Sequence, residues 1–121
     1  MSIIGIGVDI ERVERFMTSD WSARLQKRLF SVEEVDYCNS KPDPARHLCA
    51  RFAAKEATVK ALTSILPSLL TTQVEVYKDS GSPVPRLRLI NGAVLPNAVK
   101  LHVSLSHTNE IATAFVIAEI T

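Results

Sequence analysis

The stretch RFAAKEATVKAL, residues 51–62, is the feature that most constrains how this chain folds. It has the composition of a helix, and at about 100° per residue one of its sides carries little more than methyl groups. That side consists of Ala53, Ala54, Ala57 and Ala61. So small a face lets the helix lie close against a sheet. Asp43 as the N-cap and Pro44 at the first helical position predict where the helix begins, and we expect it to end near Leu62.

The chain opens with the apolar segment IIGIGVDI, residues 3–10, which predicts a strand. Gly5 and Gly7 allow another backbone to approach this strand closely. If the strand continues through Glu11, the carboxylates of Asp9 and Glu11 project to the same side, because residues two apart share a face. Two such like charges are costly unless a cation or a proton lies between them, and Mg²⁺ prefers hard oxygen ligands of this kind. Alternatively, Glu11 already belongs to a helix and Asp9 caps it.

The remaining patterns divide the chain into an early helical part and a late strand-rich part. Helical patterns begin at Arg12 and cover residues 21–30 and 31–40. Ser31 and Glu34 have the spacing of a capping box at the start of the last of these. Strand patterns cover residues 72–79, 85–90, 99–107 and 111–120, and the first two are spaced as a hairpin. We therefore expect an α+β fold, with early helices packed on a mainly antiparallel sheet in a single domain over residues 1–121.

The composition excludes several broad classes. Hydrophobic residues make up 46% of the chain and charged residues 22%, and the formal net charge is +1. A nucleic-acid-binding domain would carry a basic surplus and stacking aromatics, whereas only 6% of the residues are aromatic. No apolar stretch approaches the roughly 20 residues of a membrane-spanning helix, so we expect no membrane partner. Cys38 and Cys49 form no CxxC motif, and we expect them to be reduced, buried thiols in a cytoplasmic protein.

The 51–62 helix also carries the charges that most resemble a binding site. Glu56 and Lys60 lie one turn apart on one side of it, and Arg51 and Lys55 lie one turn apart on another. Glu56 can add a carboxylate to a metal held by Asp9, with the three cations surrounding bound phosphates. The competing interpretation is an ordinary ion pair of Glu56 with Lys60 on a solvated surface, worth a few tenths of a kcal/mol.

A third group of polar residues lies in SLSH, Ser104 to His107, at the end of a predicted strand. Its hydroxyls and imidazole can bind phosphate oxygens, and Ser106 and His107 are the candidates. A serine nucleophile with a histidine base fits poorly, because no G-x-S-x-G elbow is present and adjacent strand residues face opposite ways. A purely structural histidine is the other alternative.

Taken together and in this order, GIGVDIE, FAAKEATVKAL and SLSHT resemble the holo-acyl-carrier-protein synthase family, the small 4′-phosphopantetheinyl transferases. LFSVEEVDYC also resembles that family's F-[ST]-x-x-E segment, and the resemblance spans Ile4 to Glu119. It implies the transferase fold and an enzyme that moves 4′-phosphopantetheine from coenzyme A to a serine of an apo acyl carrier protein, of fatty-acid or polyketide type, releasing 3′,5′-ADP. A relative that binds coenzyme A or the carrier without turnover is the alternative.

The resemblance also implies roles for individual residues. Asp9 and Glu56 would hold Mg²⁺ against the coenzyme A pyrophosphate, and Lys60 would contact phosphate. Glu56, or a water held by the metal carboxylates, would take the serine proton. The D-x-E spacing, similar to that of the longer surfactin-type transferases, would make Glu11 a further metal ligand. The coenzyme A contacts would come from Arg51, Lys55, Lys60, Gly81 and Pro83 of the G-x-P loop, Ser106 and His107.

The family resemblance implies partners as well. Small members are typically homotrimers with the site between neighbouring subunits, so His107 would serve a site whose metal ligands come from the next chain. Acyl carrier proteins are acidic around their serine, and a cationic face is expected to dock them. That face consists of Arg12, Arg15, Arg24, Lys27 and Arg28.

Two segments depart from the family pattern. KALTSILPSLLTT lacks the usual glycine-containing turn after Leu62 and adds leucines. GSP lacks a basic residue that commonly stands between its glycine and proline, which removes one phosphate contact. The first departure bears on the shape of the loop near the nucleotide, and it is the only sequence feature that favours a non-catalytic relative.

Overall fold

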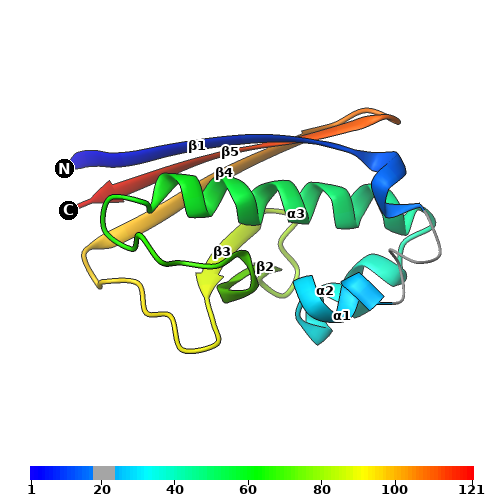
Figure 1. The fold of residues 1–121 in the computed structure, drawn as a ribbon, viewed down its shortest axis with the longest axis horizontal. Helices are drawn as coiled ribbons and strands as arrows, with labels where there is room; N and C mark the ends of the chain where they lie inside the picture. The colour runs from blue at the N-terminus through cyan, green and yellow to red at the C-terminus, as the bar shows by residue number, and fades with distance from the viewer. Residues whose placement is uncertain (18–23) are drawn as a thin grey trace.

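One long helix lies along a three-stranded antiparallel sheet, as the computed structural model of residues 1–17 and 24–121 shows (Figure 1). The helix is α3 (Pro44–Ala61), and the sheet has the strand order β1-β5-β4. Its strands are β1 (Ser2–Arg12), β4 (Val99–His107) and β5 (Ile111–Ile120). The α+β class expected from the sequence is confirmed.

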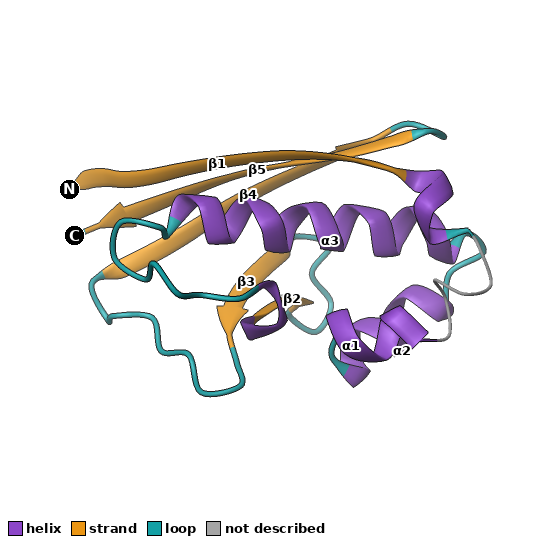
Figure 2. Cartoon of the chain, in the orientation of Figure 1, coloured by secondary structure: helices purple, strands orange, loops and turns teal. Residues whose placement is uncertain are grey.

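The other elements gather on the α3 side of this sheet (Figure 2). They are the 3-10 turn η1 (Val13–Phe16), α1 (Gln26–Leu29), α2 (Val32–Asn39), the 3-10 turn η3 (Thr71–Gln73), β2 (Val74–Lys78) and β3 (Pro85–Leu89). Strands β2 and β3 form the expected antiparallel hairpin as a separate two-stranded sheet. The helical pattern expected from Arg12 is only a 3-10 turn, because β1 continues through that residue. The helix expected over residues 21–30 lies partly outside the described residues.

Glycine and alanine bring β1 and α3 unusually close. A Cβ on Gly5 would lie 1.7 Å from the carbonyl oxygen of Ala61, and one on Gly7 would lie 1.8 Å from that of Ala57. Neither position can accept even a methyl group, so the two backbones are in direct contact. The close approach expected from the glycine pair and from the alanine face is thus confirmed, because the two glycines of β1 pack directly against the alanines of α3.

Two predicted helix starts are also present. Ser31 Oγ accepts from the backbone N–H of Glu34 at 3.2 Å, and the Glu34 carboxylate accepts from that of Ser31 at 2.9 Å, which completes the capping box. Asp43 is the N-cap residue of α3, but its side chain forms an ion pair with Arg46 at 2.9 Å instead of capping the helix. Within the described residues, no helix is long and apolar enough to cross a membrane.

Candidate active site

Strand β1 places Asp9 and Glu11 on one side, facing α3. The strand includes Glu11, and the turn that follows has Arg12 as its N-cap without a side-chain cap bond. The alternative in which Asp9 caps a helix is therefore wrong. Both carboxylates are largely covered, with side chains 12% and 11% exposed.

Helix α3 brings Glu56 to the same place, and the three carboxyl groups perturb one another. Burial, a hydrogen bond with Asp9, and the charges of Asp9 and Glu56 raise the pKa of Glu11 to about 7, although Arg15 opposes the shift. Burial and then the charge of Asp9 raise the pKa of Glu56. Asp9 Oδ2 is buried and has no hydrogen-bond partner. The cluster thus holds surplus negative charge and a free ligand atom, which is what a cation site requires.

The three groups do not form a complete cage. Within residues 1–17 and 24–121, no three His, Cys, Asp or Glu side chains are arranged to hold a metal ion. Mg²⁺ does not need such a cage, since it is usually bound by one or two carboxylates and keeps waters or phosphate oxygens in its other positions. The unpartnered oxygen of Asp9 fits that mode of binding.

Two cations accompany the carboxylates. Lys60 Nζ donates to Asp9 Oδ1 at 3.2 Å and to the carbonyl oxygen of Val8 at 2.9 Å. Lys60 therefore forms its hydrogen bonds with β1 and not with Glu56, the partner one turn away on its own helix. Its charge nevertheless lowers the pKa of Glu56. Its side chain is 53% exposed, so it remains open to a ligand. Arg15 pairs with Glu11, which sequence reasoning missed because it placed Arg15 only on the carrier-docking face.

A second, cationic region surrounds Tyr37 of α2. The guanidinium of Arg51 stacks 4.0 Å from the centre of the Tyr37 ring, and Lys78 Nζ donates to the Tyr37 hydroxyl at 2.8 Å. Lys41 Nζ lies 4.7 Å from the same ring. Burial would raise the pKa of Tyr37, but the bond from Lys78 and the charges of Lys78, Arg51 and Lys41 together lower it. Arg51 is 4% exposed, and its Nε has no hydrogen-bond partner.

Tyr37, Arg51 and Lys78 line a cavity of about 360 Å³ between α2, α3, the hairpin and β4. His47 and His107 also line it, and the His47 ring meets Tyr37 edge-on with centroids 6.1 Å apart. Burial, followed by the charges of Arg51, Lys41 and His107, lowers the pKa of His47, and Asp43 opposes this only in part. A cavity in which cations depress a histidine favours an anion.

The structure places Arg51 and His107 in the lining of one cavity, but it does not place every predicted contact residue there. Ser104 lines the cavity instead of Ser106. Gly81 and Pro83 lie exposed in the β2–β3 turn, where Gly81 has a φ of 78°. Sequence reasoning missed Tyr37, His47 and Lys78, although Tyr37 lies one turn beyond the recognised Glu34 and was within reach of a helical-face argument.

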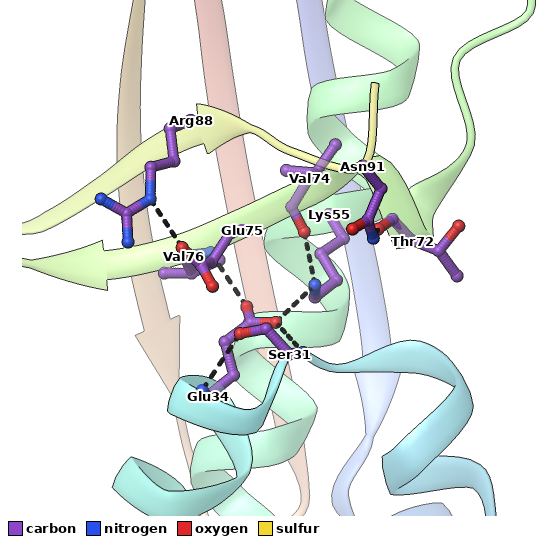
Figure 3. Close-up of polar contacts among 9 residues, drawn as sticks. All are labelled: Ser31, Glu34, Lys55, Thr72, Val74, Glu75, Val76, Arg88 and Asn91. Atoms are coloured by element: carbon purple, nitrogen blue, oxygen red, sulfur yellow. Dashed lines mark hydrogen bonds and ion pairs between the residues drawn. The ribbon is translucent and has the colours of Figure 1, made fainter. Parts of the chain in front are cut away.

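Lys55 differs most from its expected role (Figure 3). Its Nζ forms an ion pair with Glu34 Oε1 at 2.6 Å and donates to the carbonyl oxygen of Val74. Both charged side chains are at most 1% exposed. Burial lowers the pKa of Lys55, and the charge of Glu34 acts against that. The expected contact of Lys55 with coenzyme A is therefore corrected, because the ammonium group is enclosed and already partnered.

Comparison with known proteins decides the family. The sequence profile described as "4′-phosphopantetheinyl transferase superfamily" matches residues 5–117. The chain belongs to this superfamily. It is 44% identical over 125 residues to a holo-[acyl-carrier-protein] synthase of Streptomyces coelicolor, covering 98% of this chain and 99% of that one. It is 38% identical to the Chlamydia trachomatis protein of the same name, with 97% and 100% covered.

Solved structures of this superfamily have the same fold. The Mycobacterium tuberculosis acyl carrier protein synthase aligns with a TM-score of 0.73 at 31% identity, covering 99% of this chain and 100% of that one. The Bacillus anthracis holo-(acyl-carrier-protein) synthase, solved in complex with CoA (3′,5′-ADP), aligns with a TM-score of 0.77 at 27% identity over 98% of each chain.

The segment after Leu62 contains no glycine, unlike the family pattern that the sequence resembles, and packing explains how the chain turns there. Leu66 and Leu69 pack into the core formed by α3 and the sheet. The backbone N–H of Leu66 donates to the carbonyl oxygen of Leu62 at 2.8 Å, which continues the chain in a turn. Leu66 and Leu69 thus anchor the loop, whereas Leu70 is exposed.

Proposed function

We propose that this protein transfers 4′-phosphopantetheine from coenzyme A to a serine hydroxyl of an apo acyl carrier protein and releases 3′,5′-ADP. The observation that carries the proposal is the carboxylate cluster of Asp9, Glu11 and Glu56, in which Asp9 Oδ2 is buried without a partner. The names of the Streptomyces coelicolor and Chlamydia trachomatis relatives support the same reaction.

Asp9 and Glu56 would hold Mg²⁺, with Glu11 as an additional ligand. The ion would neutralise the pyrophosphate oxygens during the transfer. Lys60 of α3 supports the arrangement by donating to Asp9 and to the Val8 carbonyl oxygen of β1, and its half-exposed ammonium would be open to the same anionic group. Glu56 or a water beside the carboxylates takes the proton of the incoming serine. Such a transfer asks a protein mainly for position and charge neutralisation.

The cavity around Tyr37 would take the phosphorylated adenosine end of coenzyme A. Arg51 offers a buried guanidinium with an unpartnered Nε, and Lys78 adds a positive charge. His107 adds an imidazole to the lining. Arginine and lysine together suit a phosphate, since one supplies a planar fork and the other a point charge. The Bacillus anthracis relative, solved in complex with CoA (3′,5′-ADP), supports a coenzyme A site in this fold.

The outer face of the main sheet would form a homotrimer. On the side of β1 away from α3, Ile6, Val8 and Ile10 are 56%, 57% and 62% exposed, and Phe115 of β5 is 43% exposed. An apolar patch built from neighbouring strands is a typical protein interface. Association through this face would let one subunit's carboxylates act with the next subunit's cavity.

The apo carrier would dock on the exposed basic side chains of Arg12, Arg24, Lys27 and Arg28, with Arg15 beside them. Arg12 lies 3.6 Å from Glu14, an exposed pair that leaves its charge available. Reversing Lys27 and Arg28 to Glu is expected to raise KM for the carrier and weaken its salt dependence, because such charges mainly speed encounter. We place the activity in the cytoplasm, where the buried free thiols of Cys38 and Cys49 stay reduced.

The test is the intact mass of an apo carrier incubated with the protein, coenzyme A and Mg²⁺. We expect the carrier to gain one phosphopantetheine, and Asp9→Ala or Glu56→Ala to abolish the gain. Asp36→Ala, which removes an exposed carboxylate of α2, is the matched control. If coenzyme A raises the melting temperature of the wild-type protein but no carrier gains mass, the protein is a binding relative and the proposal fails.

A further inference from the structure

The buried ion pair of Glu34 and Lys55 connects α2, α3 and the β2–β3 hairpin, which form three sides of the cavity. Glu34 Oε1 accepts from Lys55 Nζ at 2.6 Å, and Oε2 accepts from the backbone N–H of Val76 in β2 at 2.9 Å. Lys55 Nζ in turn donates to the carbonyl oxygen of Val74 in the same strand (Figure 3). Helices α2 and α3 and strand β2 therefore meet at two charged side chains.

Each of these elements carries a residue of the proposed site a short, rigid step away. Tyr37 lies one turn beyond Glu34 on α2. Arg51 lies one turn before Lys55 on α3, and Glu56 directly follows it. Lys78 lies two residues beyond Val76 on β2, on the same side of the strand. Neither Glu34 nor Lys55 is among the residues that line the cavity.

A stabilising contribution alone does not account for such a pair. Removing two charges from water costs about as much as their attraction returns, and well-packed apolar residues often serve stability as well. The pair instead fixes the position of β2 relative to α2 and α3, because a Glu34 oxygen and the Lys55 ammonium group hydrogen-bond specific backbone groups on that strand. An apolar replacement would fill the same volume without fixing how the hairpin slides along α3.

We propose that Glu34 and Lys55 are positioning residues of the transferase, which set the arrangement of Tyr37, Arg51 and Lys78 around the cavity. The proposal rests on the function proposed above. It gives Lys55 a part in coenzyme A binding without contact, because the side chains of Tyr37, Arg51 and Lys78 must meet the phosphorylated adenosine end in a fixed arrangement. A displacement of about 1 Å in such a site can cost as much as a hundredfold in rate.

The experiment compares Lys55→Met with the double variant Glu34→Gln/Lys55→Met. The single variant leaves the Glu34 charge buried without its partner, so its melting temperature is expected to fall steeply. The double variant leaves no unpaired charge at this position, and its glutamine can still accept from a backbone N–H of Ser31 or Val76, so most of the melting temperature is expected to return. Val99→Ala, a buried substitution at the start of β4, far from His107 at its end, is the control for lost stability.

The decisive readouts are kcat/KM for coenzyme A and the Kd of 3′,5′-ADP, both taken well below the melting temperature. We expect the double variant to lose about ten- to a hundredfold in kcat/KM, with weaker 3′,5′-ADP binding, while Val99→Ala retains both values. Recovery of kcat/KM together with the melting temperature would assign the pair a purely structural role and overturn the proposal. If the double variant does not fold, Lys55→Arg, which keeps the charge but changes its reach, is measured in the same way, and unchanged kinetics would have the same consequence. A wild-type protein that transfers nothing would instead refute the proposed function.

Discussion

Replacement of Gly7 by alanine is expected to separate β1 from α3 beside the carboxylate cluster. The new Cβ would lie 1.8 Å from the carbonyl oxygen of Ala57, and an ordinary contact of 3.4 Å exceeds this by 1.6 Å. The obstacle is helix backbone, so no side chain can rotate away to make room. Gly7 lies two residues before Asp9, and Ala57 follows Glu56, so the displacement acts directly on the pair expected to hold the metal.

The magnitude follows from that displacement. Overpacking of a tight core typically costs up to about 3 kcal/mol, and this contact belongs at the upper end because it involves backbone on both sides. For a chain of this length, such a loss lowers the melting temperature by roughly 10 °C. A shift of more than about 1 Å at the carboxylates is expected to reduce kcat by about a hundredfold.

The assay is transfer to an apo carrier at a temperature at which the variant is folded, with thermal unfolding measured in parallel. Gly92→Ala makes the same chemical change at a φ of 88° with nothing within 4 Å. It is expected to cost about 1 kcal/mol of backbone strain and no activity. A Gly7→Ala protein with wild-type kcat would refute the reasoning, since it would mean that the separation of β1 and α3 does not set the site.

Further substitutions test other parts of the site. The pKa of His47 in the folded state lies below its ordinary value, so the unfolded chain binds the proton more readily and stability falls below about pH 6.5. His47→Gln removes this proton-binding group and is therefore expected to reduce the loss of stability on acidification. Urea unfolding midpoints from pH 7.5 to 5.5 would measure the difference. An equal slope in the variant would contradict this. Glu11→Gln is expected to raise the Mg²⁺ concentration needed for half-maximal transfer, and an unchanged requirement would remove Glu11 from the ligand set. Lys78→Met should raise KM for coenzyme A about tenfold, because it deletes a charged contact in the cavity. Val8→Lys places a charge on the outer sheet face and should yield monomers in analytical ultracentrifugation, whereas an unchanged oligomer would exclude this face as the interface.

Some features of this fold follow from local chemistry and are legible in the sequence. The capping box of Ser31 and Glu34 depends on a spacing of three residues, and the hairpin depends on two alternating segments with a turn between them. The alternation of β1 likewise placed Asp9 and Glu11 on one side once the strand was known to continue. The capping box and the hairpin depend on residues close in sequence, whereas the continuation of β1 through Glu11 depends on its pairing with β5.

The sequence alone determined the α+β class, the small helix face and the family motifs, because these are properties of period, residue size and order. The partners of the charges were decided only by the tertiary structure. A helical wheel pairs Lys60 with Glu56 and leaves Lys55 open, whereas packing turns Lys60 toward Asp9 and encloses Lys55 with Glu34. Charge attraction depends on distance and burial, and both arise from contacts between segments far apart in the chain, which no local pattern encodes.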